Sequence, residues 1–515
     1  RAGHRHRVGL LAHAGSWDIH HCAVLVSLGP DAVCPWLGCQ TVGPDREEKY
    51  LAGLRSGFVE AMSMTGVTPS SAYCGAGLIE AVGLERGFLD REFPGVPGHL
   101  GGIGPETLDA EWLGFHRTAF AGDPTLPDFG EFRHSKEGRP HANNADIVRN
   151  LQGASGYARK IHAATPGSWE AYVAYSRLVK ERAPITVLDL LEVAENDAIA
   201  LDQVESVERI AWRFMAPGMS EGALSEPAHR SVAHGLNLLR RYCRLYGGEM
   251  PAGVGPVANS GEGGFDKTRV GRRDANRSVQ YSGGRFTITP HTAATALEAE
   301  VKFAQGAKPG KGGQLPGKKV TPEVAARRGC EPGYELVSPP INHNLYSIED
   351  VKLMVESWRH LNPNVNCALK YVATHGVEMV ALGGVNAGAN RLHLSDGCGG
   401  TGAAKRVDQK LMLLGADGGG FGPSLLIAIG CSMLRKCHLA GPDPADPTGK
   451  RRLGCTPGVA TQDPVHLARY SGKPKHVARY LLFVAREIRE AMAAAGIRDL
   501  GSVIGRRDLL VKKND

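Results

Sequence analysis

The sequence predicts an α/β protein that is built on a parallel sheet or barrel. From about residue 200 onward, apolar segments of strand length alternate with helical patterns, which is typical of βαβ units. Glycine is abundant at 67 residues, and the excess is concentrated near Gly306–Gly317, Gly397–Gly402 and Gly415–Gly422. Because glycine lets a backbone approach a ligand closely, these clusters indicate binding loops between the elements.

The elements of this second part follow from their hydrophobic patterns. We expect an amphipathic helix over Ile348–His360, which begins after Ser347, and a second helix over Gly376–Ala389. The segments expected to form strands are Tyr334–Ser338, Cys367–Val372, Arg391–Ser395 and the glycine-rich Gly419–Gly430.

A long helix near the end of the sequence is the clearest single element. It is expected from His476 to Ala495, and Gly496 is a suitable stop. Its apolar residues recur at helical spacing and form one stripe, made of Val477, Leu481, Val484, Ile488 and Met492. Such a stripe predicts packing against a hydrophobic core.

The first part of the sequence, residues 1–195, has a different pattern of apolar segments and turns. It mixes short apolar runs such as Cys22–Val26 with helical patterns such as Tyr50–Met64, and Gly/Pro-rich turns follow around Pro94–Pro105. This mixture indicates a separate α/β or α+β domain. A charged stretch from Glu192 to Glu205 follows it, so we place the domain boundary between residues 195 and 196.

Composition and charge limit the function classes. The 515 residues are 42% hydrophobic and 22% charged, and no apolar run approaches the roughly 20 residues that span a bilayer. The N-terminus lacks the apolar segment of a signal peptide, so a cytoplasmic protein is expected. A net charge of +7 is modest for this length; it suits an anionic substrate or an acidic redox partner and does not indicate nucleic-acid binding.

The loop Ala304–Lys319 is a candidate anion site. Its glycines permit close backbone approach, and Lys308, Lys311 and Gln314 offer hydrogen-bond donors. Arg327 and Arg328 follow shortly after. The pattern is typical of a carboxylate or phosphate site, and a solvated basic loop is the alternative.

Three cysteines near the C-terminal end of the barrel region form a second candidate site. Cys431 and Cys437 are separated by five residues, and Cys455 lies eighteen residues further on. Their thiolates could hold an iron–sulfur cluster, whereas buried structural cysteines are the alternative. Zinc is disfavoured, because no C-x2-C pair occurs and His438 is the only histidine nearby. The odd total of eleven cysteines also argues against a disulfide scaffold.

Two further glycine loops could bind ligands. Ser395–Gly402 directly follows an expected strand, and such loops bind phosphates or flavins in α/β barrels. Asn259–Gly264 carries one acid, Glu262, and is weak evidence when taken alone.

Together, these segments closely resemble the large subunit of glutamate synthase. The resemblance covers almost the whole sequence in order. In the second part it rests on Asn259–Gly264, Ala304–Val320, Ser338–Asp350, Gly399–Gly402, Cys455–Pro464 and Ile504–Leu510. In the first part it rests on Ile19–Leu25, Gly29–Val33 and Gly101–Gly104, which are similar to the central domain of that family.

The resemblance implies a fold and a reaction. It implies an FMN-binding (β/α)8-like barrel of the TIM type, preceded by part of a central domain. Members of the family aminate 2-oxoglutarate with ammonia, and reduced FMN delivers hydride to give L-glutamate. Electrons reach FMN through a [3Fe-4S] cluster, from an NAD(P)H-oxidising small subunit or from ferredoxin. The NAD(P)H-linked type is preferred, because no extra loop follows Gly264.

The resemblance also assigns roles to individual residues. The candidate catalytic residues, as binders of the 2-oxoglutarate dianion, are Lys308, Gln314 and Arg328. The candidate FMN ligands are Met219, Ser220, Gln280, Lys370, Gly399, Gly400, Gly420 and Gly422. The candidate cluster ligands are Cys431, Cys437 and Cys455.

The sequence departs from the family in several places. The glutaminase domain is absent from this chain, a loop over Gly441–Leu453 is inserted between two cluster cysteines, and about one βα unit is missing between Gly402 and Gly415. Around Phe265 the family has a further acid. Two alternatives follow: a related flavoprotein that uses another amine, as in N-methylglutamate synthesis, or a non-catalytic remnant of the fold.

Overall fold

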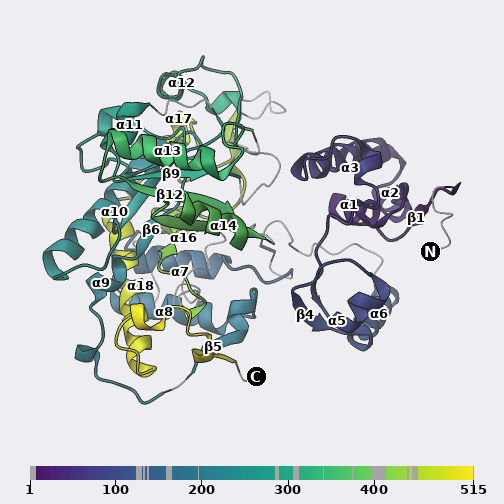
Figure 1. Cartoon of the computed structure of the whole chain (residues 1–515), viewed down its shortest axis with the longest axis horizontal. Coiled ribbons are helices and arrows are strands. Elements are labelled where there is room, and N and C mark those ends of the chain that lie inside the picture. The colour runs from purple at the N-terminus through teal and green to yellow at the C-terminus, as the bar shows by residue number, and fades with distance from the viewer. Residues whose placement is uncertain are drawn as a thin grey trace. The chain divides into compact units, whose positions relative to one another are not determined.

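The computed structural model describes residues 7–122, 130, 134–135, 138–157, 165–194, 196–284, 289–304, 313–339, 342–373, 376–395, 413–437, 440–442 and 451–513. The chain forms two compact units, Arg1–Pro127 and Asp128–Asp515 (Figure 1). No helix in the described ranges is both long enough and apolar enough to cross a lipid bilayer.

The first unit is a small α/β structure. Its helices are α1 (Ile19–Leu28), α2 (Trp36–Val42), α3 (Pro44–Met64), α4 (Ser70–Tyr73), α5 (Arg86–Glu92) and α6 (Pro105–Phe120). Its strands form two parallel pairs, β1 (Leu11–His13) with β2 (Ala32–Cys34) and β3 (Val82–Leu84) with β4 (Leu100–Ile103). The Asp18 side chain caps α1 by accepting from the backbone N–H of His21, so the apolar run at Cys22–Val26 is helical.

The second unit is organised around a seven-stranded parallel sheet. In the sheet the strands lie in the order β13-β12-β9-β8-β7-β6-β14. Their bounds are β6 (Phe214–Ala216), β7 (Val257–Glu262), β8 (Ser278–Tyr281), β9 (Glu298–Lys302), β12 (Asn366–Val372), β13 (Arg391–Ser395) and β14 (Gly419–Gly420). Every pairing within the sheet is parallel, which confirms the predicted α/β fold.

The strand order identifies the sheet as a partial (β/α)8 barrel. Each strand lies beside its predecessor in the chain, except that the last strand, β14, pairs with the first strand, β6. A return of this kind closes a TIM-type barrel. Strands β13 and β14 are the two edges of the sheet as described. Residues 396–418 join them in the chain, and 396–412 of these lie outside the described ranges. The missing βα unit was predicted in this same part of the sequence.

The helices around the sheet are α7 (Ala145–Ser155), α8 (Trp169–Glu181), α9 (Val207–Ala211), α10 (Glu226–Tyr246), α11 (Pro290–Thr295), α12 (Pro322–Arg328), α13 (Ile348–Leu361), α14 (Val377–Asn386), α16 (Pro423–Ala428), α17 (Pro464–Leu467) and α18 (Pro474–Ala494). Three antiparallel pairs complete the unit: β10 (Gln314–Leu315) with β11 (Leu336–Val337), β5 (Leu191–Val193) with β17 (Leu510–Lys512), and β15 (Ala440–Pro442) with β16 (Arg451–Leu453).

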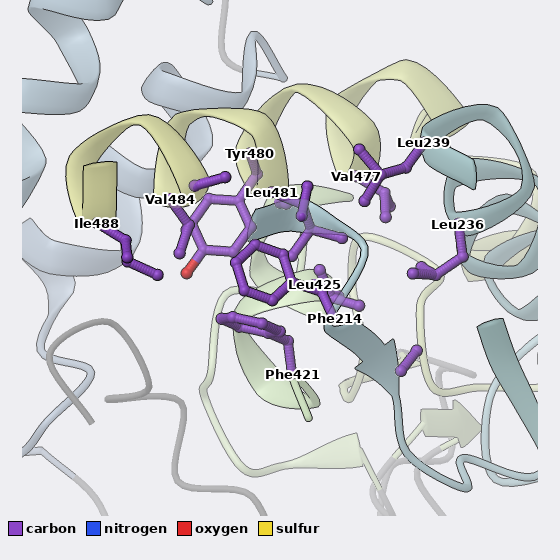
Figure 2. Packing of buried hydrophobic residues seen from close by; sticks show 14 of the residues in the cluster. Phe214, Leu236, Leu239, Phe421, Leu425, Val477, Tyr480, Leu481, Val484 and Ile488 are labelled. Carbon is purple, nitrogen blue, oxygen red and sulfur yellow. The ribbon is translucent and has the colours of Figure 1, made fainter. Parts of the chain in front are cut away.

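The largest core lies between α18, α10 and the β6–β14 edge of the sheet. All five residues of the predicted apolar stripe of α18 are buried there, and Gly496 ends the helix with a φ of 68°. Figure 2 shows Leu481 of α18 close to Phe214 of β6 and Leu425 of α16, while Val477 lies beside Leu239 of α10. The C-terminal helix therefore holds the two ends of the barrel sequence together.

The packing division differs from the boundary predicted at residues 195/196. Helices α7 and α8 precede that boundary, yet Leu151, Tyr172 and Tyr175 are buried in the same core as α18. Tyr172 also donates to Glu487 Oε2 over 2.7 Å. Residues from 128 onward therefore pack with the barrel, because the apolar faces of these two helices need a partner that lies more than 300 residues away in the sequence.

The local predictions agree closely with the structure, with one error. Ser347 caps α13 in a capping box with Asp350, and β13 has the predicted bounds. The strand predicted over Gly419–Gly430 is wrong beyond Gly420. Pro423 occupies the first turn of α16, where its missing N–H and fixed φ favour a helix start.

Candidate functional site

The interior of the barrel is lined by charged side chains. Along β9, the alternate residues Glu298, Glu300 and Lys302 are 0%, 0% and 9% exposed. The residues between them, Ala299 and Val301, pack into the apolar cluster beneath α13. Side chains alternate across a strand, so the three charged residues share the inner face. TIM-type barrels usually fill this space with branched apolar side chains, so a charged interior indicates a functional site.

Glu300 is the centre of this interior network. Its Oε1 accepts hydrogen bonds from Asn259 Nδ2 over 3.0 Å and from Gln280 Nε2 over 2.7 Å. Its Oε2 accepts from His393 Nδ1 over 2.9 Å. Burial alone would raise the pKa of Glu300, but His393, Lys370 and the Gln280 amide lower it to about 2. The carboxylate therefore stays ionised and accepts hydrogen bonds from three other strands, while Lys370 of a fourth acts on it electrostatically.

A second carboxylate lies deeper in the barrel. Glu298 accepts a hydrogen bond from the Ser278 hydroxyl over 2.7 Å and forms an ion pair with Arg391. Burial raises the pKa of Glu298, and the negative charge of Glu300 raises it further. The Arg391 guanidinium lowers the pKa but does not cancel these two effects. These residues are the first of strands β8, β9 and β13, so the pair lies at the amino-terminal end of the barrel interior.

Glu262 forms a third centre, at the carboxyl end of β7. It is paired with Lys302 Nζ over 3.1 Å and accepts from the Ser282 hydroxyl over 2.8 Å. Burial would raise the pKa of Glu262, but Lys302 and the hydroxyls of Ser338 and Ser282 lower it overall. A Cβ on Gly313 would come within 2.6 Å of Glu262 Oε2, so only glycine lets the returning chain pass over this carboxylate.

Several of the predicted flavin ligands are brought together at the carboxyl ends of the strands. Gly261 has a φ of 65°, and a Cβ there would come within 2.4 Å of the backbone N of Ser220. A Cβ on Gly218 would come within 2.6 Å of Gln280 Nε2. The loop that carries Met219 and Ser220 is therefore held closely against β7 and the amide of Gln280.

The remaining flavin candidates fall into two groups. Lys370 lies in β12; burial lowers its pKa, and nearby Glu300 opposes that shift. A Cβ on Gly420 or Gly422 would lie 3.9 or 3.7 Å from the ring of Pro217, so both glycines lie beside the loop after β6. Gly399 and Gly400 lie outside the described residues.

Two of the three predicted 2-oxoglutarate residues, Gln314 and Arg328, lie in the described part of the structure. Lys308 lies outside the described residues. Gln314 is exposed and donates to Glu335 Oε1 over 2.7 Å. Arg328 is only 5% exposed, and its Nη2 donates to the carbonyl oxygens of Glu221 over 2.8 Å and Glu262 over 3.3 Å. Arg328 thus links the loop after β6 to the carboxyl end of β7.

The three predicted cluster cysteines lie near one another. A thiol hydrogen bond joins Cys437 and Cys455; this bond and the backbone N–H groups of Ala460 and Val459 lower the pKa of Cys455. The Ala460 N–H donates to Cys455 Sγ over 3.2 Å. The Cys431 thiol interacts electrostatically with Cys455, and burial raises its pKa to about 11.

The backbone between Cys431 and Cys437 has an unusual conformation. Met433 and Arg435 have φ values of 54° and 56°, and they are the only non-glycine residues with positive φ in the described part of the chain. Such strain is concentrated at ligand sites. Within the same ranges, no group of three or more His, Cys, Asp or Glu side chains is placed to hold a metal ion. A cluster of several irons differs from one ion, because each cysteine ligates a different iron.

Sequence reasoning missed most residues at the centre of the network, namely Glu298, Glu300, Lys302, Arg391 and His393. A signal for them was present in the strand Glu298–Lys302, where charged and apolar residues alternate strictly. Alternation of this kind indicates a strand with one apolar and one polar face. In a strand covered by helices, the polar face must point into the barrel.

The depressed pKa of Glu300 predicts a fold that is sensitive to acid. The pKa is about 2 in the folded chain against 4.5 for the free side chain, so folding favours the ionised form. This contribution, about 3 kcal/mol, is complete above about pH 4.5 and is lost as the pH falls toward about 2. Urea unfolding of the wild type and of Glu300→Gln measures it. The stability difference between them should shrink on acidification, and a constant difference would contradict the assignment.

Comparisons with known proteins agree with the partial barrel fold. Residues 155–411 and 408–498 match the family model described as a conserved region in glutamate synthase, and residues 1–85 match the glutamate synthase central domain. The NADPH glutamate synthase large chain of Bacillus subtilis is 33% identical over 99% of this chain. The ferredoxin-dependent glutamate synthase of Pyropia yezoensis is 30% identical over 98%. These alignments span 35% and 36% of the relatives, so the chain covers about a third of their length.

Proposed function

The chain belongs to the glutamate synthase family, and we propose that its barrel carries out the synthase half-reaction, in which 2-oxoglutarate and ammonia give L-glutamate. The observation that carries this proposal is the buried network around Glu300 and Glu262 at the mouth of the barrel. It supplies fixed charges and donors at the end of the barrel where enzymes of this fold react.

The barrel has features that fit a flavin. The close approaches at Gly218 and Gly261 hold the loop that carries Ser220 against β7 and the Gln280 amide. Lys370 adds a buried cation whose charge is held in place by Glu300. Bound FMN would supply the hydride, and these residues would orient the ring and balance its charge.

Substrate binding is assigned to the loop over residues 304–319 and its neighbours. We propose that Lys308 and Gln314 contact the 2-oxoglutarate dianion, and that Arg328 holds the adjoining loops in place and contributes positive charge. Gln314 is bonded to Glu335 in this structure, so binding requires it to exchange that partner for the substrate. Lys302, which is paired with Glu262, is a second positive charge close to the proposed substrate site.

The cluster is assigned to Cys431, Cys437 and Cys455. The backbone N–H bond to Cys455 and the left-handed residues Met433 and Arg435 support this assignment. A bound cluster would pass single electrons to the flavin. The relatives include NADPH-dependent and ferredoxin-dependent enzymes, so the preference for NAD(P)H stays a prediction from the sequence.

The proposal can be tested with the purified chain. It is loaded with FMN anaerobically, the flavin is reduced chemically, and 2-oxoglutarate is added with ammonium or with methylamine. We expect flavin oxidation and L-glutamate formation with ammonium. N-methylglutamate as the main product would favour the alternative amine. Tight FMN binding without oxidation by either pair would contradict the proposal, and a chain that binds no FMN would support a non-catalytic remnant.

Lys308→Ala is expected to raise the KM for 2-oxoglutarate about tenfold or more. The reason is that a charge-assisted hydrogen bond to a carboxylate contributes about 1.5–3 kcal/mol. Steady-state kinetics at varied 2-oxoglutarate, with FMN affinity measured in parallel, checks this result. Lys318→Ala in the same loop is the matched control and should leave the KM unchanged. An unchanged KM in Lys308→Ala would remove Lys308 from the substrate site.

A further inference from the structure

A pocket of about 410 Å³ lies at the opposite end of the barrel from the candidate active site. One wall is the face of α10 that carries Arg240, Arg241 and Arg244. The other wall comes from the residues that lead into the strands: Arg277 directly precedes β8, and Leu297 directly precedes β9. The pocket therefore lies at the amino-terminal ends of the strands, away from Glu262 and the flavin candidates.

The pocket is strongly cationic. Five arginines line it, namely Arg240, Arg241, Arg244, Arg273 and Arg277. None of the five forms an ion pair with a carboxylate of the described ranges. The carboxylate that acts on pocket residue His234 belongs to Asp274, which is paired with Arg230 over 2.7 Å and with Arg272 over 3.4 Å. Five cations without carboxylate partners in these ranges repel one another in part, since Arg241, Arg244 and Arg273 are exposed to solvent, and an anion that enters would be attracted by all five.

Arg240 is the most informative of the five. Its side chain is only 9% exposed, and its Nη1 has no hydrogen-bond partner among the described residues. Its guanidinium lies 5.0 Å from the ring of Trp212, which also faces Arg244 at 5.7 Å. Burial, Arg244 and Arg277 lower the pKa of Arg240 to about 10, so it keeps its charge at neutral pH. A buried charged donor without an acceptor is costly, and a ligand acceptor would remove that cost.

The pocket is already formed without a ligand. Asn237 Nδ2 donates to the carbonyl oxygens of Arg273 over 3.0 Å and Ala275 over 2.8 Å, which ties the segment before β8 to α10. Leu238 and Leu297 add apolar surface to the lining. The volume falls within the usual range for small-molecule sites, about 300–1,000 Å³.

We propose that this pocket binds a small anion that carries phosphoryl groups. Guanidinium groups bond phosphate oxygens in pairs, and several adjacent arginines favour a ligand with several negative charges over a single carboxylate. The pocket is partly open to solvent, and its volume of about 410 Å³ fits a small molecule. The site is separate from the synthase reaction, so occupancy would act on the stability of the barrel through α10, which packs on α18 and β7.

Isothermal titration calorimetry of the purified chain with inorganic pyrophosphate and with ADP tests the proposal. One pyrophosphate is expected to bind per chain, with an affinity that weakens as salt is added. Arg240→Met should weaken binding about tenfold or more, because it removes one charge-assisted contact. Arg244→Gln removes a second pocket arginine, at an exposed position where the substitution does not endanger folding. Arg507→Gln, on an exposed segment outside the pocket, is the control.

Each outcome decides a point. ADP that binds at least about tenfold more tightly than pyrophosphate identifies a nucleotide, and equal affinities identify a free phosphate anion; both support the site. The absence of binding by both probes would overturn it. Binding that survives Arg240→Met and Arg244→Gln, or that falls equally in Arg507→Gln, would also overturn it. Binding of poly-glutamate in place of pyrophosphate would replace the proposal with an acidic protein partner.

Discussion

A Cys455→Ser variant is expected to lose all of its bound iron. The proposed cluster is held by Cys431, Cys437 and Cys455, and a serine hydroxyl does not replace a thiolate ligand under ordinary conditions. Cys455 Sγ also accepts the hydrogen bond from the Ala460 N–H, so the variant removes a proposed ligand and alters a backbone contact. Iron analysis and the visible absorption spectrum after anaerobic purification measure the loss.

The control for this result is Cys330→Ser. Cys330 is half-buried in the same unit, and its thiol makes one long contact of 3.8 Å with the carbonyl oxygen of Ala325. This variant should retain the iron content of the wild type. If Cys455→Ser retained iron as well, the three cysteines would be structural, and the strained backbone at Met433 and Arg435 would need another explanation.

Arg391→Met is expected to destabilise the second unit by about 3–5 kcal/mol at neutral pH. Arg391 is the cation paired with Glu298, which is fully buried, and loss of one partner of a buried ion pair leaves the other charge uncompensated. Methionine keeps most of the side-chain volume, so the change is mainly one of charge. Urea unfolding followed by circular dichroism measures the effect.

A double variant isolates the ion pair from the loss of packing. Glu298→Gln removes the charge but leaves an oxygen that can accept from Ser278, so Arg391→Met/Glu298→Gln should be more stable than Arg391→Met alone. The raised pKa of Glu298 gives a second prediction. The loss of stability in Arg391→Met should become smaller as the pH is lowered, because the Glu298 carboxyl then takes up a proton and no longer needs a cation. A cost below about 1 kcal/mol at neutral pH would show that the carboxyl is already protonated there.

Local elements were predictable from the sequence because their determinants are local. The stripe of α18 repeats at helical spacing, and Ser347 with Asp350 forms a capping box within four residues. The glycine loops predicted close approach to a ligand; Gly261 and Gly313 approach protein atoms closely, and the ligand contact stays a prediction. The same locality explains the error at Gly419–Gly430, where an apolar run was read as a strand although Pro423 starts a helix.

The contents of the candidate site could be predicted only in part. Motif resemblance identified Gln280 and Lys370, which lie in the interior network, and three cysteines that lie near one another. It did not identify His393 or Glu300, because these two residues matter through the hydrogen bond that they form with each other. Their side chains meet across the sheet from positions 93 residues apart.

The sequence by itself determined the fold class, the order of strands and helices, and the family to which the chain belongs. Hydrophobic periodicity, caps and motifs are properties of neighbouring residues, so they can be read before folding. Only the tertiary structure decided which charged residues share the barrel interior, which unit receives α7 and α8, and that five arginines surround one pocket. Those features arise from the parallel pairing of strands and from helix packing, which bring together residues whose separation along the chain carries no information about their distance in space.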